Sequence, residues 1–228
     1  MAGSGFGTNF RITTWGETHG AGVGVVVDGC PAGLPLERED VQKYLDRRKP
    51  GQSKYTTQRK EGDQVEILSG IFEGRTTGTP ISMVVYNKDQ RSKDYSNIKD
   101  IYRPGHADFT FDMKYGFRDY RGGGRSSGRE TIGRVAAGAV AAKVLKELGI
   151  EIKAYAKAIA GIEVSKDYFD FAEMNNNPFN MPDKEAAKLV QEKADQMIKE
   201  MDSIGGIIEC QITGMPVGIG ETVFDKLD

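Results

Sequence analysis

The sequence has few of the residues on which metal sites and disulfide scaffolds depend. Its 228 residues include two cysteines, Cys30 and Cys210, and two histidines, His19 and His106. Two cysteines are too few for a disulfide framework, and because each lies in an apolar run we expect both to be buried free thiols. The histidines and cysteines are not spaced as metal ligands. We therefore predict a protein without a metal site.

The sequence also lacks several patterns that mark whole classes of proteins. No glycine-rich loop ends in Gly-Lys-Ser or Gly-Lys-Thr as in a P-loop, and no Gly-x-Gly-x-x-Gly opens a βαβ unit as in a Rossmann site. No serine or cysteine stands in a nucleophile elbow. There is no signal peptide and no apolar run long enough to cross a bilayer. We expect a cytoplasmic location and no membrane partner.

A strong excess of charge is missing as well. The 31 basic and 33 acidic residues leave a net charge of -2, which argues against a dedicated nucleic-acid-binding protein. The charges are unevenly distributed, because residues 43–60 and 117–134 are basic and residues 163–202 are acidic. Basic stretches on a nearly neutral chain suit small anionic ligands better than long polyanions.

What the sequence does contain is a mixture of strand and helix patterns. Their spacing predicts an α+β fold with antiparallel strands rather than βαβ units. Strands are expected at residues 6–14, 23–27, 64–68, 81–86, 151–162 and 206–213, and helices at 36–49, 110–115, 131–148 and 183–201. The polar stretch 87–100 is interpreted as a surface loop or lid, and 170–182 as an exposed loop. Asp183 is the expected N-cap of the last helix, whose methionines we interpret as core residues.

Residues 103–134 carry an unusual concentration of anion-binding features. His106 follows a Pro-Gly turn, and three consecutive glycines at 122–124 can form a nest of converging N–H groups. Ser126 and Ser127 are N-cap candidates, and Ser127 has the spacing of a capping box with Glu130. The free N–H groups at the start of the following helix, with Arg125 and Arg129, predict a phosphate site.

That stretch has an alternative interpretation as a solvated arginine-rich surface or an RGG-type nucleic-acid-binding segment. The glycines lie directly ahead of a strongly patterned helix, which favours an ordered site.

Two further segments contribute candidates. His19 lies in a glycine-flanked turn between two strands, where it could approach a ligand or simply cap a backbone group. Arg47 and Arg48 end a helix, as the helix dipole alone would favour. Lys54 continues this basic loop among hydroxyl side chains, which makes a phosphate or nucleotide contact plausible. Histidines beside bound anions suit acid catalysis, because loss of a phosphate needs a proton donor and cations.

Several long motifs occur in an order that resembles the chorismate synthase family. They are Gly16-Glu17-Thr18-His19-Gly20, Arg103-Pro104-Gly105-His106-Ala107-Asp108, and residues 118–131, which begin Arg118-Asp119-Tyr120-Arg121. Residues 46–51 and 55–59 also look like that family. The resemblance implies a lyase of the shikimate pathway, which makes aromatic amino acids. It would convert 5-enolpyruvylshikimate-3-phosphate into chorismate by 1,4-anti elimination of phosphate, with reduced FMN required but not consumed.

The resemblance also assigns roles to residues. His19 and His106 would be the acid–base pair, with His19 assigned to the departing phosphate and His106 to the flavin. Arg125, Ser126 and Ser127 correspond to an FMN-contacting segment, and Arg48 and Lys54 to NADPH contacts. The family usually has arginine where Lys54 stands, so the charge is kept but the bidentate fork is lost. Arg47, Arg129 and Arg134 are our candidates for binding the phosphorylated substrate.

The fold implied by the resemblance is a sandwich of antiparallel sheets around a helical layer, assembled as a homotetramer. Family chains continue beyond Asp228, so we expect residues 1–228 to form a single domain that is incomplete at its C-terminal end. Such a fragment is expected to bind FMN weakly and to turn over slowly or not at all. A fragment that binds phosphate or flavin without catalysis therefore stays an alternative.

Overall fold

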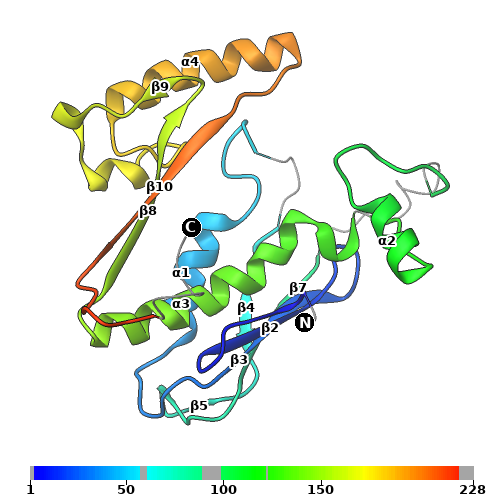
Figure 1. Cartoon of the computed structure of the whole chain (residues 1–228), viewed down its shortest axis with the longest axis vertical. Helices are drawn as coiled ribbons and strands as arrows, with labels where there is room; N and C mark the ends of the chain where they lie inside the picture. Colours follow the sequence, from blue (N-terminus) through cyan, green and yellow to red (C-terminus); the bar gives the residue numbers. More distant parts are fainter. Residues whose placement is uncertain (1–2, 57–60, 89–98, 122, 221–228) are drawn as a thin grey trace. The chain divides into compact units, whose positions relative to one another are not determined.

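The computed structural model describes residues 3–56, 61–88, 99–121 and 123–220. By their internal contacts they divide into two compact units, Met1–Val144 and Leu145–Asp228. The described residues form antiparallel sheets and four α-helices, which is the α+β fold that the sequence predicts (Figure 1). The expectation of one domain, incomplete at its C-terminal end, stays a prediction.

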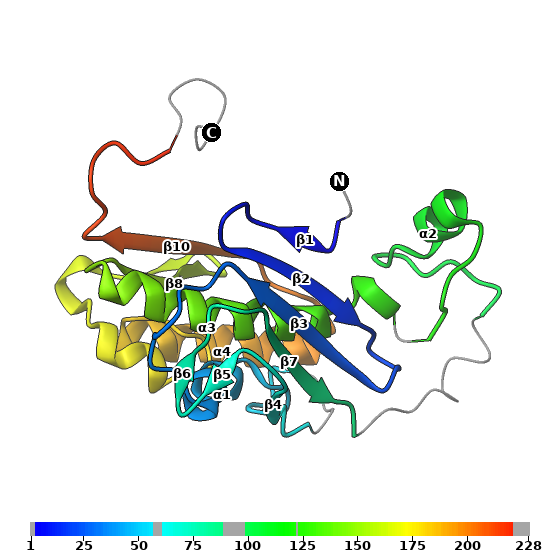
Figure 2. The same cartoon turned by 90° about the horizontal axis from the view of Figure 1, so that it is seen from below.

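The first unit is built on a five-stranded antiparallel sheet (Figure 2). Its order is β1-β2-β3-β7-β4, with bounds Gly5–Phe6, Arg11–Gly16, Gly22–Asp28, Ile81–Tyr86 and Val65–Ile67. The central strand β3 is rich in valine and almost wholly buried. Val25 of β3 pairs with Thr14 of β2 and with Met83 of β7. This arrangement confirms the predicted strands at 23–27 and 81–86.

Two helices pack against this sheet in one hydrophobic core. They are α1, Arg38–Arg48, and α3, Thr131–Glu147. The core joins valines of β3 with Val41 and Leu45 of α1 and with Ile132 and Val140 of α3. Small residues let α3 come very close to the strands. A Cβ atom added to Gly133 would lie 3.0 Å from the carbonyl oxygen of Gly24 and 3.0 Å from Thr14 Cγ2.

A second close approach lies within the sheet. Trp15 of β2 pairs with Gly24 of β3. A Cβ atom on Gly24 would lie 2.4 Å from Cζ2 of the Trp15 indole, so the ring lies directly against the glycine backbone. Trp15 is 38% exposed, so its other side meets solvent. Only glycine leaves room for an indole at this cross-strand position.

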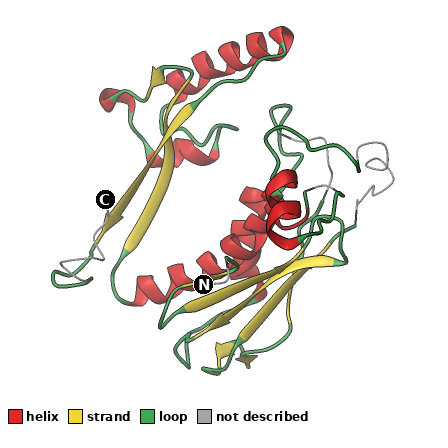
Figure 3. Cartoon of the chain, turned by 45° about the vertical axis from the view of Figure 1, so that its right-hand side comes forward, coloured by secondary structure: helices red, strands yellow, loops and turns green. Residues whose placement is uncertain are grey.

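The second unit combines a three-stranded antiparallel sheet with one long helix (Figure 3). The strands β8, β9 and β10 are Glu151–Ile159, Ile162–Glu163 and Gly206–Thr213, and the helix α4 is Lys184–Glu200. Asp183 caps α4 as predicted, because its Oδ1 accepts from the backbone N–H groups of Glu185 and Ala186, each at 2.9 Å. A small core forms around Ala156, Met181, Ala186, Ala187 and Val190.

The remaining elements are short. They are the helix α2, Asp108–Tyr115, the hairpin β5–β6 at Ile71–Phe72 and Arg75–Thr76, and 3-10 turns at Gly124–Ser126, Gly128–Glu130, Lys166–Tyr168 and Phe171–Asn175. Most of the predicted loop or lid at 87–100 lies outside the described residues, which omit 89–98.

Some expectations for the second unit were wrong. The segment 170–182 is not simply an exposed loop, because Met174 and Met181 are buried in it and Asn177 hydrogen-bonds to the carbonyl of Met181. Cys210 is exposed on β10, whereas Cys30 is buried as expected. Met201 is 94% exposed and ends α4 in a left-handed conformation rather than filling the core. An apolar pattern does not reveal whether another layer covers a strand or a helix end.

No helix in the described residues is long or apolar enough to traverse a bilayer. The same residues contain no group of three histidine, cysteine or acidic side chains placed to hold a metal ion.

Candidate functional site

The turn that carries His19 is held in place by the end of a neighbouring strand. It connects β2 to β3, and His19 is buried within it. Asn87, just after β7, donates from Nδ2 to the carbonyl oxygens of Glu17 and Gly20, each at 2.9 Å. The Asn87 backbone N–H donates to the carbonyl of Ala21 at 3.0 Å. One asparagine therefore fixes the backbone on both sides of the histidine.

The glycine-rich segment meets the same turn. Thr18 Oγ1 donates to the carbonyl of Gly124 at 3.3 Å. Arg125 donates from Nη1 to the carbonyl of Gly16 at 2.9 Å and from Nη2 to Thr14 Oγ1 at 2.7 Å. The predicted flavin-contacting arginine thus ties its own segment to β2. Its guanidinium is engaged with protein atoms rather than pointing wholly into solvent.

The two serines behave differently from each other. Ser126 is exposed, and its hydroxyl donates to the carbonyl of Gly123 at 2.7 Å. Ser127 caps the 3-10 turn ahead of α3, where its Oγ accepts from the Arg129 N–H at 3.3 Å. Ser127 is therefore an N-cap as expected, but its hydroxyl accepts from Arg129 rather than from Glu130, as a capping box would require. The Glu130 carboxylate accepts instead from Thr14 Oγ1 at 2.6 Å and from Arg134 Nε at 2.8 Å.

One buried carboxylate joins two arginines that the sequence assigned to different ligands. Asp63 accepts from Arg48 Nη1 at 2.6 Å on Oδ2 and from Arg129 Nη1 at 3.1 Å on Oδ1. Arg129 Nε also donates to Asn87 Oδ1 at 3.1 Å. Through Asn87, this ion-pair cluster is linked to the His19 turn. Arg48 Nε donates to Thr131 Oγ1 at 3.2 Å, which connects α1 to the start of α3.

Sequence reasoning did not identify Asp63 or Asn87 as site residues. Asp63 lies in a short polar stretch between a basic loop and β4, where an acid is usually solvated. No local pattern shows that its side chain is fully buried. The sequence indicates only that a buried arginine needs an acidic partner. It does not indicate which acidic residue is that partner.

His106 lies on a turn that leads into α2. It is exposed, and its Nδ1 lies 3.3 Å from the carbonyl oxygen of Pro104. Its Cδ2 lies 3.7 Å from the position that a Cβ atom on Gly123 would take, and Ser126 Oγ lies equally close to that position. The structure therefore brings His106 beside the Gly123–Ser126 segment. A cavity of about 30 Å³ lies between the His19 turn, α2 and this segment, lined in part by Glu17, Asp108, Gly124 and Ser126.

Electrostatics fix the turn before α2. Arg103 donates from Nε and Nη2 to the two oxygens of Asp108, at 2.8 and 2.9 Å. Hydrogen bonds from Arg103 outweigh the effect of burial and lower the pKa of Asp108 to about 2. Arg118 lies 3.6 Å from the same carboxylate and donates to Asp112 at 2.9 Å. The His106 loop is thus anchored by a carboxylate that stays charged in all but strong acid.

The remaining predicted site residues are Arg47, Lys54 and Arg134. The side chain of Arg47 is exposed on α1. Lys54 places its ammonium 5.2 Å from the centroid of the Tyr55 ring. Arg134 is exposed on α3, one turn beyond Glu130, with which it forms an ion pair.

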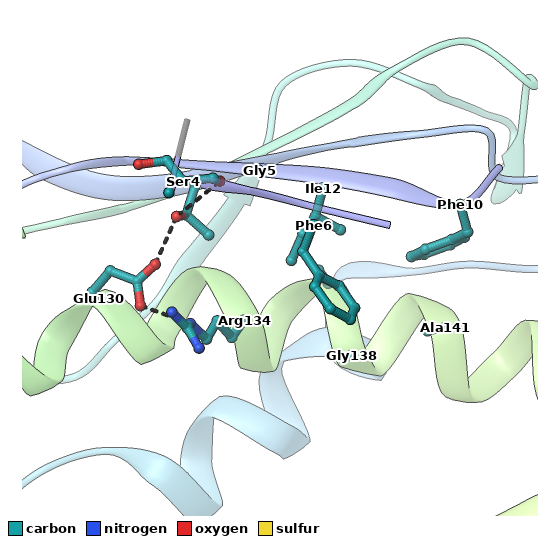
Figure 4. Close-up of a pocket in the computed structure, with 12 residues that line it drawn as sticks. Ser4, Gly5, Phe6, Phe10, Ile12, Glu130, Arg134, Gly138 and Ala141 are labelled. Atoms are coloured by element: carbon teal, nitrogen blue, oxygen red, sulfur yellow. Dashed lines mark hydrogen bonds and ion pairs between the residues drawn. The ribbon is translucent and has the colours of Figure 1, made fainter. Parts of the chain in front are cut away.

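Arg134 lines a different, mostly apolar pocket between β1, β2 and α3 (Figure 4). The pocket has a volume of about 420 Å³. Phe6, Phe10 and Ile12 form one wall, and the α3 residues, including Gly138, form the other. Figure 4 shows the Glu130–Arg134 ion pair at one end. Neither histidine lines this pocket.

Comparison with known proteins identifies the family. A family model described as chorismate synthase matches residues 10–228. The chorismate synthases of Lachnospira eligens and Agathobacter rectalis are 69% and 63% identical over 228 residues, and that of Methanococcoides burtonii is 58% identical over 230. Each match covers this whole chain.

The chain spans about 62% of the length of these curated relatives. A crystal structure of a chorismate synthase superposes with a TM-score of 0.69 at 30% identity, covering 90% of this chain and 58% of the other. The family match over nearly the full chain and the resemblance of the fold agree with the motifs around both histidines. The chain therefore belongs to the chorismate synthase family.

Proposed function

We propose that this chain contributes the phosphate- and proton-handling part of a chorismate synthase active site. The reaction would be the 1,4-anti elimination of phosphate from 5-enolpyruvylshikimate-3-phosphate, catalysed by a carbon–oxygen lyase. The observation that carries the proposal is the convergence of the buried His19 turn with Arg129 through Asn87. A proton donor and a cation held in one network are what phosphate loss requires.

The two guanidinium groups on Asp63 are suited to receive the negative charge of departing phosphate. Arginine forms bidentate hydrogen bonds with phosphate oxygens, and the interaction is stronger away from bulk water. The side chain of Arg129 is 6% exposed and that of Arg48 is 19% exposed. We assign Arg129 to the substrate and Arg48 to either the substrate or the phosphate of NADPH. Arg47, Arg134 and Lys54 stay predictions.

His19 is proposed to protonate the leaving phosphate. Histidine can donate a proton near neutral pH, and the turn that carries it is held from both sides. His106 is proposed to maintain the protonation state of the flavin, since it is exposed beside Gly123 and Ser126. The two histidines would then act on different partners.

The residues beside His106 fit a flavin in part. The exposed hydroxyl of Ser126 and the N–H groups that open the 3-10 turns offer hydrogen bonds to a phosphate or a ring edge. Arg125, which holds the segment to β2, would act by positioning rather than by direct contact. When bound, reduced FMN would supply electron density to the substrate as phosphate leaves. The NADPH reductant, the cytoplasmic location and the homotetramer also stay proposals.

Anaerobic assays of the chain with reduced FMN and substrate test the proposal. We expect slow or no phosphate release from the 228-residue chain. In a version extended to the full length of its relatives, we expect His19→Ala and His106→Ala each to lower release by about a hundredfold or more with little change in thermal stability. Thr13→Ala, an exposed change on β2, is the matched control. Quenching of flavin fluorescence without phosphate release would favour the non-catalytic alternative. Normal phosphate release by either full-length variant would remove that histidine from the proposed mechanism.

A further inference from the structure

We propose that Asp63 is a positioning residue, which sets the guanidinium groups of Arg48 and Arg129 as one receptor for a phosphoryl anion. The inference rests on the proposed function for the identity of that anion. It does not depend on turnover.

Asp63 is held unusually firmly for a residue outside regular structure. Its side chain is fully buried, and its backbone has a φ of 43°, in the left-handed region that costs free energy for residues other than glycine. Gln42 of α1 donates to the Asp63 carbonyl at 3.2 Å and accepts from the Val65 N–H at 3.0 Å. The surrounding structure thus fixes both the backbone and the carboxylate. A strained, over-determined residue of this kind is often found at a functional site.

The Asp63 carboxylate is shared by the guanidinium groups of Arg48 and Arg129. One carboxylate faces two guanidinium groups, and both arginines are largely withdrawn from water. Within the described residues, the buried Nη2 of Arg129 has no hydrogen-bond partner. A phosphoryl oxygen would supply the missing acceptor.

The two oxygens of the Asp63 carboxylate bind different arginines, and this explains how Asp63 positions them. Oδ2 receives Arg48 and Oδ1 receives Arg129, so two like-charged groups that would otherwise repel each other are held at a fixed separation. Arg129 is further oriented by Asn87, which also holds the His19 turn. A carboxamide could not do the same, since it offers one acceptor and one donor.

Inorganic phosphate binding by the 228-residue chain tests the inference, with calorimetry for affinity and NMR of the arginine Nε–H groups for the site. In the wild type, we expect the Arg48 and Arg129 signals to shift along one binding curve. Asp63→Asn should weaken phosphate binding about tenfold or more and make the two signals respond separately. Glu66→Gln, which removes an exposed carboxylate from β4, should leave the affinity unchanged.

A purely structural ion pair would give a different result. Asp63→Asn would then lower stability while leaving phosphate affinity unchanged in the folded protein, which would overturn the inference. If that variant does not fold, Asp63→Glu keeps the charge but displaces it by one methylene, and an unchanged affinity would overturn the inference equally. So would a wild-type titration in which phosphate shifts only one arginine. Joint arginine shifts, together with no substrate turnover by a version extended to the full length of the relatives, would support the positioning role and count against the proposed lyase activity.

Discussion

Asp108 illustrates how single charged residues shape the loops around the histidines. Arg103 binds both of its oxygens and also donates its backbone N–H to Oδ2 at 3.1 Å. The pKa of Asp108 is lowered to about 2 from an ordinary value of 3.8, first by the hydrogen bond from Arg103. The folded state therefore prefers the charged carboxylate more strongly than the unfolded chain does.

This preference predicts a specific dependence of stability on pH. Because the folded pKa lies below the unfolded one, the contribution is complete above about pH 4 and is lost as the pH falls toward 2. It amounts to at most about 2 kcal/mol. We expect Asp108→Asn to be less stable at neutral pH and to lose less stability than the wild type between pH 4 and 2. Free energies of unfolding against pH measure this, with the exposed Asp100→Asn as control. Parallel curves for wild type and variant would contradict it.

At the residue level, the sequence identified the histidines and arginines but not the residues that hold them. His19, His106 and Arg129 stand in recognisable motifs, whereas Asp63 and Asn87 act through contacts with residues distant in the chain. Arg125 stays a predicted flavin contact, and the sequence did not show that it also contacts Thr14 and Gly16. The residue types predict the kind of ligand that a site can bind, but only the fold determines which acidic residue pairs with each arginine.

Among the elements, α3 contains two glycines, Gly133 and Gly138, that have different roles. Gly133 faces the sheet, where an added Cβ atom would lie 3.0 Å from the Gly24 carbonyl oxygen. Gly138 is exposed on the same helix, with no atom within 4 Å of an added Cβ. The first glycine permits close packing, whereas the second only lowers helix propensity.

The two glycines therefore form a matched pair for mutation. Gly138→Ala should raise the free energy of unfolding by about 0.5–1 kcal/mol, because alanine favours the helix. Gly133→Ala gains the same propensity but pushes α3 away from a central strand, so we expect a net loss of about 1–3 kcal/mol. Chemical denaturation measures both changes. Equal effects of the two substitutions would show that α3 does not pack tightly at Gly133.

Most helices and strands could be predicted because their periodicity is local. The helix at 131–148 and the strands at 23–27 and 206–213 agree with the structure within one or two residues at each end. The segment 170–182 was harder, since its polar, asparagine-rich sequence hides two buried methionines. The exposure of the β10 side chains was not predictable either, because it depends on whether another helix or sheet packs over the strand.

The whole described chain consists of two units with separate cores. Val25 is fully buried in the core of the first unit, and Val190 is fully buried in that of the second. The two buried clusters share no residue. Separate cores allow each unit to open on its own.

Cavities made in each core should therefore have local effects. We expect Val25→Ala and Val190→Ala each to cost about 2 kcal/mol and to speed amide hydrogen exchange mainly in the unit that contains the change. Native-state exchange followed residue by residue measures this, with Thr13→Ala as a surface control. Faster exchange throughout both units after either substitution would mean that the chain unfolds as one cooperative body.

The packing of Trp15 against Gly24 gives the protein a built-in optical probe. Trp15 is the only tryptophan in the sequence, and it precedes Gly16, whose carbonyl accepts from Arg125. Its indole packs against Gly24 of β3 and is 38% exposed, on the strand that leads into the His19 turn. We expect a ligand that shifts this strand or the turn after it to change the emission of a single fluorophore, and a flavin bound within range would accept its excitation energy. Binding at this site can thus be followed by light without attaching a label.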